Sequence, residues 1–261
     1  MPVKLLFLFL SPLCLGNALA QQNDTVYISA ANIKTHQLKE GRSTYLVYMK
    51  TGKEVPRSMT QFWSIDVKRK KERDKDVIEV WQSWEYKDTI VHTATSICDA
   101  QTFKPLSHES WWNKNGKKTT SVFDYQARCI TVDGADATKD RSEKGTQTTN
   151  GFLAAVHHYH LNWHLDLEVF STLPFALHTT YAIPFYEAGY KQPEYIFYTV
   201  AGEDNLEGYG GHDVACWLLT HETPGNIEKY WISKTTYEVL KLEQDIGGKM
   251  SRYKIKLALD N

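Results

Sequence analysis

The sequence predicts a mostly β protein built from an antiparallel sheet. Apolar and polar residues alternate with a period of two along much of the chain, which is the pattern of strands with one buried face. Aromatic residues make up 13% of the 261 residues, with eight Trp and fifteen Tyr, and such large flat side chains are favoured in pleated sheets. Short turn sequences separate the alternating segments, so we expect neighbouring strands to pair as hairpins.

The last third of the chain predicts a meander of four strands. The alternation is clearest at the end, where Tyr253, Ile255 and Leu257 share one face with Leu259. Residues 245–248 end in two glycines, which tolerate the positive φ of a hairpin turn. The four expected strands lie at residues 214–219, 228–232, 240–243 and 253–259.

The first half predicts longer strands of the same kind. Residues 68–76 between two of them are all charged. We expect these charges at a solvated hairpin end, where they also discourage edge-to-edge pairing. The expected strands are residues 44–50, 59–70, 77–87, 89–98, 107–112, 118–125 and 129–132.

One polar loop and one helix interrupt the strands. Residues 134–151 are rich in Thr, Lys, Asp and Gly and predict a long mobile loop. From residue 152 to residue 173, apolar residues recur every three or four positions, which predicts a single amphipathic helix that ends before Pro174. We expect this helix to lie across the sheet and bury its stripe, which is Leu153, Val156, His160, Trp163, Leu167 and Phe170.

The first twenty residues predict export. A lysine precedes an apolar run over residues 5–15, and Ala18-Leu19-Ala20 places small residues where a signal peptidase reads them. The run is too short to span a membrane, and no second run reaches that length. We expect residues 1–20 to be a signal peptide cleaved near Ala20-Gln21. A lipid anchor on Cys14 is the alternative, although the residues before this cysteine are not the small ones that such processing requires.

The mature product is then expected to be residues 21–261, a single antiparallel β domain located in the periplasm or secreted. Lys and Arg number 30 and Asp and Glu 31, so the charge balance offers no reason to bind nucleic acid. The three remaining cysteines permit one disulfide and one free thiol, or three small buried side chains. They are Cys98, Cys129 and Cys216.

Histidines cluster at the centre of the predicted helix, at His157, His158, His160 and His164. On a helix, His157, His160 and His164 are spaced so that their imidazoles could converge on one metal ion. The HExxH pattern is absent, and no glutamate stands where a general base would be needed. The alternative is a set of imidazoles on a partly exposed helix with no metal.

Tryptophans are the other candidate site. Trp81 and Trp84 are expected on opposite faces of one strand, because side chains alternate along it. If the sheet is covered on one side only, some aromatic rings line a groove or face solvent, where they can take up acyl chains, sugars or a partner's side chains. If both faces are covered, all of them are core. The candidate ligand-binding residues are Trp81, Trp84, Trp112, Trp163 and Phe170.

The sequence contains no strong catalytic motif. There is no GxSxG nucleophile elbow, and Cys216 lies in an apolar strand, a poor environment for an activated thiolate. Two carboxylates distant in sequence could still meet in space, but no pair stands out. The sequence therefore favours a binding protein over an enzyme and predicts no cofactor.

Parts of the second half resemble a known family. The residues that carry the likeness are 121–125, a helix closing on 172–175, and segments 198–203, 215–219 and 230–243. In order and spacing, residues 90–261 resemble the exported bacterial family called Domain of Unknown Function 3108. The 230–243 hairpin, with its WIS and VLKLE segments, is also similar to strands of periplasmic lipoprotein carriers of the LolA and LolB type.

This resemblance implies a curved antiparallel sheet, a half-barrel or open barrel, with one helix across its concave side and a periplasmic location. It implies no catalytic residues. We therefore expect a non-enzymatic binding protein for a lipid, a lipoprotein or another apolar ligand. The alternatives are a carbohydrate-binding protein that stacks sugars on Trp and Tyr, and a metal-dependent hydrolase that uses the 157–164 segment.

Overall fold

The computed structural model of the chain describes residues 24–258 except residues 53, 115, 190, 209 and 210. The predicted signal peptide and its cleavage point lie outside the described residues. The helices are α1 (Glu143–His157) and α2 (Asp166–Ser171), with 3-10 turns η1 (Thr35–Gln37), η2 (Ala137–Lys139) and η3 (Trp163–Leu165). The strands are β1 (Asp24–Tyr27), β2 (Gly41–Lys50), β3 (Ser58–Glu72), β4 (Lys75–Tyr86), β5 (Thr89–Asp99), β6 (Pro105–Lys114), β7 (Lys117–Asp124), β8 (Cys129–Val132), β9 (Ala135–Asp136), β10 (Leu161–Asn162), β11 (Thr179–Tyr186), β12 (Glu194–Glu207), β13 (Asp213–Thr223), β14 (Asn226–Ser233), β15 (Val239–Ile246) and β16 (Met250–Lys256).

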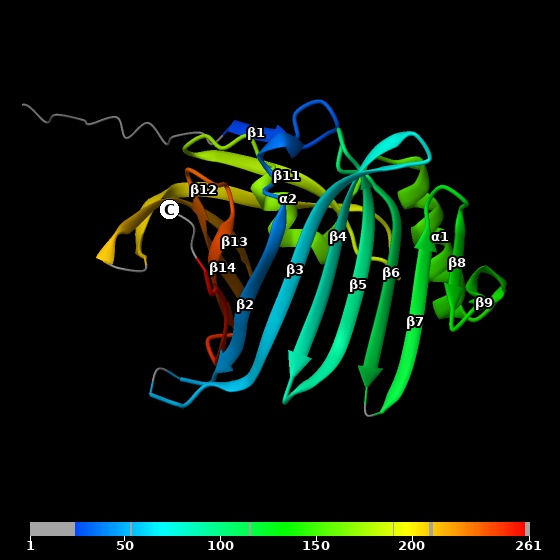
Figure 1. Cartoon of the computed structure of the whole chain (residues 1–261), viewed down its shortest axis with the longest axis horizontal. Helices are drawn as coiled ribbons and strands as arrows, with labels where there is room; N and C mark the ends of the chain where they lie inside the picture. Colours follow the sequence, from blue (N-terminus) through cyan, green and yellow to red (C-terminus); the bar gives the residue numbers. More distant parts are fainter. Residues whose placement is uncertain (1–23, 53, 115, 190, 209–210, 259–261) are drawn as a thin grey trace, which may run out of the picture.

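The described strands form one curved sheet of sixteen strands (Figure 1). Two antiparallel meanders, β2–β9 and β11–β16, are joined because β16 pairs with β2. At one edge β1 and β10 run parallel to β11, and at the other edge lies the β8–β9 hairpin. The two edges are not hydrogen-bonded to each other, so the sheet is an open half-barrel. The predicted fold class is confirmed.

The strand predictions hold for β2–β8 and β13–β16. The predicted four-strand meander is β13–β16, and the charged run ends the β3–β4 hairpin, with Arg73 and Asp74 at positive φ in its turn. Strands β11 and β12 were missed, as were the short strands β1, β9 and β10. In β11, seven of the eight residues are buried, so residues 181–186 form an apolar run with no alternation to detect.

The predictions of a loop over residues 134–151 and of a single helix over residues 152–173 were wrong. Helix α1 begins at Glu143, inside the expected loop, because the Ser142 hydroxyl caps it by accepting from the Gly145 amide at 3.0 Å. It ends at His157, and the chain then runs extended into β10. The Asn162 side chain accepts from the His164 amide at 3.0 Å, which starts a new turn in place of a continued helix.

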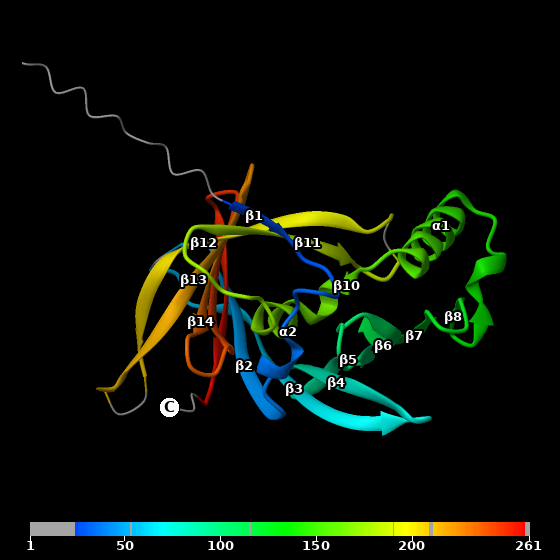
Figure 2. The same cartoon turned by 90° about the horizontal axis from the view of Figure 1, so that it is seen from above.

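Helix α2 lies inside the curve of the sheet, with β11 and β12 on one side and β3–β5 on the other (Figure 2). Phe170 is fully buried, and its ring centroid lies 4.7 Å from that of Tyr198 and 4.8 Å from that of Tyr230. The Lys254 ammonium of β16, itself only 3% exposed, donates to the Asp166 carboxylate at 3.1 Å. The concave side is therefore packed by the chain itself at this point.

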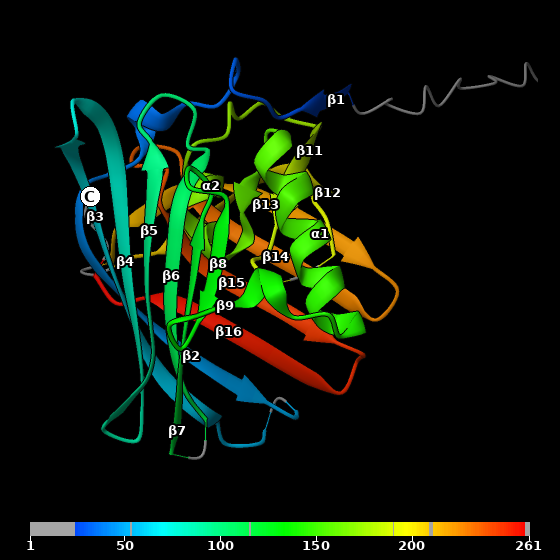
Figure 3. The ribbon, with the colours of Figure 1, turned by 90° about the vertical axis from the view of Figure 1, so that its right-hand side faces the viewer.

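Helix α1 stands at the open side of the half-barrel, beside β8 and β9 (Figure 3). Its Phe152 and Ala155 form a second small core with Phe123 of β7, Ile130 of β8 and Tyr186 of β11. Side-chain packing through α1 thus connects the two arms of the sheet that backbone hydrogen bonds leave apart.

Cys98, Cys129 and Cys216 are free thiols in the described structure, and two of them are buried, which fits the expectation of small buried side chains better than a bridge. No helix in the described part of the chain is long and apolar enough to cross a membrane.

Replacing Trp231 with Ala is expected to lower the free energy of unfolding by about 3–5 kcal/mol. Trp231 lies between β13 and β15, is 7% exposed, and donates from its indole nitrogen to Asp204 at 2.8 Å. Urea denaturation measures the change. Phe62→Ala, at a 44% exposed position, is the control and should stay within about 0.5 kcal/mol. A Trp231→Ala loss below about 1 kcal/mol would contradict the packing.

Candidate functional site: a groove beside the first helix

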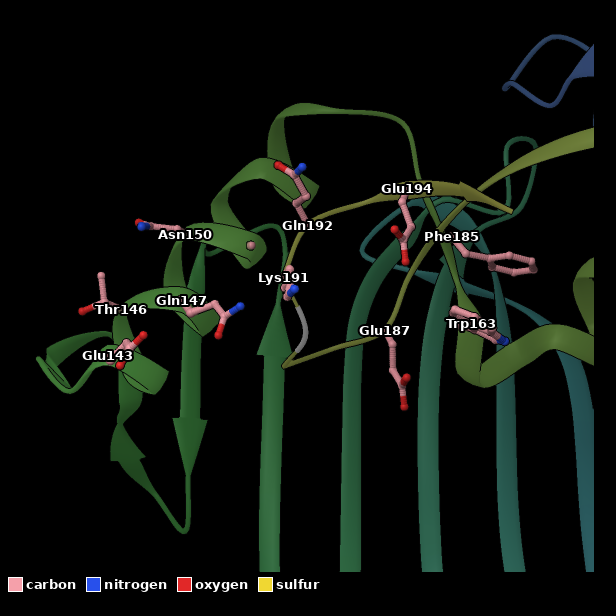
Figure 4. A pocket seen from close by; sticks show the side chains of 11 residues that line it. Glu143, Thr146, Gln147, Asn150, Trp163, Phe185, Glu187, Lys191, Gln192 and Glu194 are labelled. Atoms are coloured by element: carbon pink, nitrogen blue, oxygen red, sulfur yellow. The ribbon is translucent and has the colours of Figure 1, made fainter. Parts of the chain in front are cut away.

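A groove opens between α1 and the connection from β11 to β12 (Figure 4). Its cavity volume is about 810 Å³, within the range of small-molecule binding sites. The lining residues are Glu143, Thr146, Gln147, Asn150, Gly151, Trp163, Phe185, Glu187, Lys191, Gln192 and Glu194.

One wall of the groove is the polar face of α1. Glu143, Gln147 and Asn150 are four and three residues apart, so they lie on one side of the helix. The opposite side carries Phe152 and Ala155 into the small core described above. Because that core fixes the helix, the amide side chains of Gln147 and Asn150 are presented to the groove while they stay exposed.

The aromatic end of the groove is formed by Trp163 and Phe185 (Figure 4). Their ring centroids lie 5.6 Å apart with an interplanar angle of 22°, a stacked arrangement. Phe185 is buried and supports Trp163, which is partly exposed. The pair therefore gives the groove a flat apolar surface held by the core.

The second polar wall comes from the end of β11, the connection and the start of β12. It carries the carboxylates of Glu187 and Glu194, the amide of Gln192 and the ammonium of Lys191. Partial desolvation raises the pKa of Glu187 above its ordinary value. The groove as a whole thus offers hydrogen-bonding groups on two walls and an aromatic surface at one end.

The predicted ligand-binding residues are distributed over four places. Trp163 lies in the groove. Trp84 and Trp112 lie together on the concave face, with ring centroids 5.3 Å apart. Trp81 lies on the other face of β4, near the Arg42 guanidinium at 5.9 Å. Phe170 is fully buried in the core and presents no surface to a ligand.

The polar walls of the groove were missed by sequence reasoning. A usable signal was present, since a serine followed by Glu143, Gln147 and Asn150 at helical spacing is typical of a capped helix with a polar face. Their place opposite Glu187 and Glu194 follows only from the packing of α1 against β11, which no local pattern encodes.

The three histidines proposed as metal ligands do not converge. His157 is exposed at the end of α1. His160 is buried with its ring centroid 5.0 Å from that of Tyr125, and His164 contacts the sheet wall instead. The helix expected to align them is broken between the first and the second. Among the described residues, no group of three or more His, Cys, Asp and Glu side chains is arranged to hold a metal ion.

His164 instead joins a network with two histidines of the sheet. The Nε2 atoms of His92 and His164 are 3.0 Å apart. On β6, His108 lies close by, with its ring centroid 5.2 Å from that of His164. Desolvation lowers the pKa of His92 and of His108 to about 4, and that of His164 well below its ordinary value. All three imidazoles are therefore neutral at pH 7.

One contact in this network has the distance of a nucleophile and its base. The hydroxyl of Ser96 lies 2.8 Å from Nδ1 of His108, and the Asn162 amide nitrogen lies 3.1 Å from the same atom. Ser96 is fully buried and His108 is 3% exposed. A substrate has no access to this hydroxyl, so the contact is structural.

Glu168 of α2 is a buried carboxyl group without a partner at one oxygen. It is 5% exposed, and its Oε2 accepts no hydrogen bond from the described residues. Desolvation and the nearby Asp166 carboxylate raise the pKa of Glu168 to about 8. The side chain is therefore largely a neutral acid at pH 7.

The fold and the groove define a class: an open, curved β half-barrel with a ligand-sized groove at its side. The family model described as "Protein of unknown function (DUF3108)" matches residues 44–254. The chain belongs to this family. The expected resemblance is confirmed, and the match begins well before residue 90.

Known structures add a distant likeness. A β-barrel-like protein of Domain of Unknown Function 1849 from Brucella abortus is 8% identical, with a TM-score of 0.41, over 84% of this chain and 96% of that chain. A Domain of Unknown Function 1329 family protein from Desulfovibrio piger is 9% identical, with a TM-score of 0.26, over 87% of this chain and 90% of that chain. No curated protein matched the sequence.

Replacing Glu168 with Gln is expected to stabilise the protein increasingly as the pH rises. Between the ordinary carboxyl pKa and about 8, the folded state holds a proton that the unfolded state has lost. Folding of the natural chain therefore weakens as pH rises through this window. The gain in unfolding free energy should grow from near zero at pH 4.5 to on the order of 3 kcal/mol at pH 8.

Urea denaturation at several pH values measures this difference. Glu194→Gln, at an exposed position, is the control and should show no trend with pH. A constant difference between Glu168→Gln and the natural chain would mean that Glu168 is ionised in the folded state.

Proposed function

We propose that the protein is an exported, non-enzymatic binding protein that takes an oligosaccharide in the groove beside α1. The observation that carries this proposal is the stacked pair of Trp163 and Phe185 at one end of the groove. The flat C–H faces of a sugar ring pack on an indole, and such packing removes apolar surface from water.

The walls support a saccharide because they offer hydrogen-bonding partners at many points. Gln147, Asn150 and Gln192 each carry an amide that both donates and accepts, and the carboxylates accept. Sugar hydroxyls need both kinds of partner, since an unpaired polar group on either side weakens binding. An acyl chain would leave these groups without partners.

The lipid and lipoprotein alternative has less support from the geometry. It requires an apolar hollow on the concave side of the sheet. That side is occupied by α2, whose Leu167, Val169 and Phe170 are buried against the strands. The groove beside α1 is open and mixed in polarity, which suits a polar ligand with apolar faces.

Export is supported by the sequence of residues 1–20, with its apolar run and small residues before Gln21. A periplasmic or secreted location is part of the proposal. Fractionation of cells that make the chain tests it, and the mature protein should begin at Gln21 and appear outside the cytoplasm.

Replacing Trp163 with Ala is expected to weaken oligosaccharide binding about tenfold or more, because the exposed aromatic contact of the site is lost. Isothermal titration calorimetry with cellohexaose and with the hexamer of N-acetylglucosamine measures it. Trp111→Ala is the matched control, since Trp111 lies away from the groove, beside Lys118. Its effect should be within about twofold.

Gln147→Ala combined with Asn150→Ala provides a second variant on an exposed helix face, where folding is not at risk. It should weaken binding by about threefold to tenfold.

Binding of neither hexasaccharide, or equal binding by Trp163→Ala, would refute the proposal. A fluorescent fatty acid bound in a Trp163-dependent way would favour the lipid alternative instead.

A further inference from the structure

Two consecutive residues of η3 have side chains with different roles. Trp163 forms the aromatic end of the groove. His164 contacts the sheet, where its ring stacks on Trp84 with centroids 5.4 Å apart and an interplanar angle of 13°. Any change that moves His164 away from the sheet therefore moves Trp163 as well.

The hydrogen bonds of His92 fix which atoms carry protons. Its Nδ1 lies 2.9 Å from the Trp111 carbonyl oxygen, and a carbonyl only accepts, so Nδ1 carries the hydrogen. The Nε2 of neutral His92 is then an acceptor. The 3.0 Å contact requires His164 to donate from its own Nε2. A single added proton leaves a hydrogen bond between the two rings, because either imidazole can donate to the other. The contact is lost once both imidazoles are protonated, since two donors and two like charges then face each other.

Besides the pairing of β10 with β11, two neutral side-chain contacts hold the turn to the same wall. The Gln82 amide donates to the His164 carbonyl oxygen at 3.2 Å. The Asn162 amide donates to Nδ1 of His108 at 3.1 Å, so this nitrogen must be unprotonated. Both imidazoles of the sheet therefore accept a hydrogen bond that a proton would replace.

We propose that the His92–His164 hydrogen bond is a proton-sensitive latch: acidification breaks it, releases residues 161–165 from the sheet and withdraws Trp163 from the groove. The effect of the latch on a ligand rests on the proposed function, whereas the release of the turn does not.

The surrounding charges add to the repulsion between the two protonated rings and so favour release. His108 on β6 and the Lys254 ammonium on β16 both lower the pKa of His164 by repulsion. Lys114 extends over Trp112 at 5.3 Å, and Trp112 in turn contacts His92 with ring centroids 3.9 Å apart. Asp166 on α2 is the nearby carboxylate, and it is already paired with Lys254.

The direction with pH follows from proton binding. The latched state binds protons weakly, since the pKa of His92 and His108 is about 4, whereas released imidazoles titrate near their ordinary pKa of about 6.5. The released state takes up more protons and gains population as pH falls from about 6.5 toward 4. Above this window the latch is closed.

Hydrogen–deuterium exchange of the natural chain tests the latch without a ligand. After correction for the intrinsic pH dependence of exchange, protection of residues 161–165 should fall at least tenfold between pH 7 and pH 4.5. Strands β4 and β5 should stay protected over the same range. Unchanged protection of residues 161–165, or loss together with β4 and β5, would overturn the proposal.

His92→Gln supplies the matched variant, because its amide can accept from His164 but never gains a proton. This variant should keep residues 161–165 protected at pH 4.5, whereas His157→Gln, at an exposed position, should behave like the natural chain. Equal loss in His92→Gln would overturn the latch. If His92→Gln fails to fold, the exchange pattern of the natural chain still tests the latch.

A second arm uses the hexamer of N-acetylglucosamine as the probe. Its affinity should fall at least tenfold from pH 7 to pH 4.5 in the natural chain and less than threefold in His92→Gln. A pH-dependent release of residues 161–165 without binding of this hexamer or of cellohexaose would keep the latch and refute the proposed function. Binding with the same pH dependence in both chains would refute the latch and keep the function.

Discussion

The packing of α2 inside the curve of the sheet is the constraint on which the rest of the structure depends. Phe170 fills the space between Tyr198 and Tyr230, and the ion pair of the buried Lys254 with the partly exposed Asp166 fixes the start of the helix to β16. Removing one partner of such a pair leaves a buried charge and is strongly unfavourable. The half-barrel is therefore filled by its own chain where α2 lies, and the groove lies elsewhere.

That site forms where the sheet fails to close. The edges at β8–β9 and at β1–β11 are connected by α1 through the small core around Phe152. The polar face of α1 is left facing the β11–β12 connection, and the chain that leads into α2 places Trp163 between them. The segment that leads into α2 thus also supplies Trp163 to the groove. The proposed latch between His92 and His164 holds this segment against the sheet, and it therefore acts on the groove as well.

The sequence predicted β13–β16 well, because burial there is one-sided and the alternation survives, but it missed β12. It also predicted the curved sheet through its likeness to the family. It did not predict β11, which is buried on both faces, or the break at Asn162, where a side-chain cap competes with helix continuation. Trp163 was identified from its residue type, but Phe170 was assigned to the same site although α2 buries it. The hydrogen bond between His92 of β5 and His164 of η3 joins residues 72 positions apart, so no local sequence pattern predicts it.

The crystal structure of the chain soaked with the hexamer of N-acetylglucosamine tests the central claim most directly. The account predicts a sugar ring stacked on Trp163 between α1 and the β11–β12 connection, with α2 in place. A ligand on the concave side with α2 displaced, or one bound over Trp81 and Trp111 on the outer face, would contradict it.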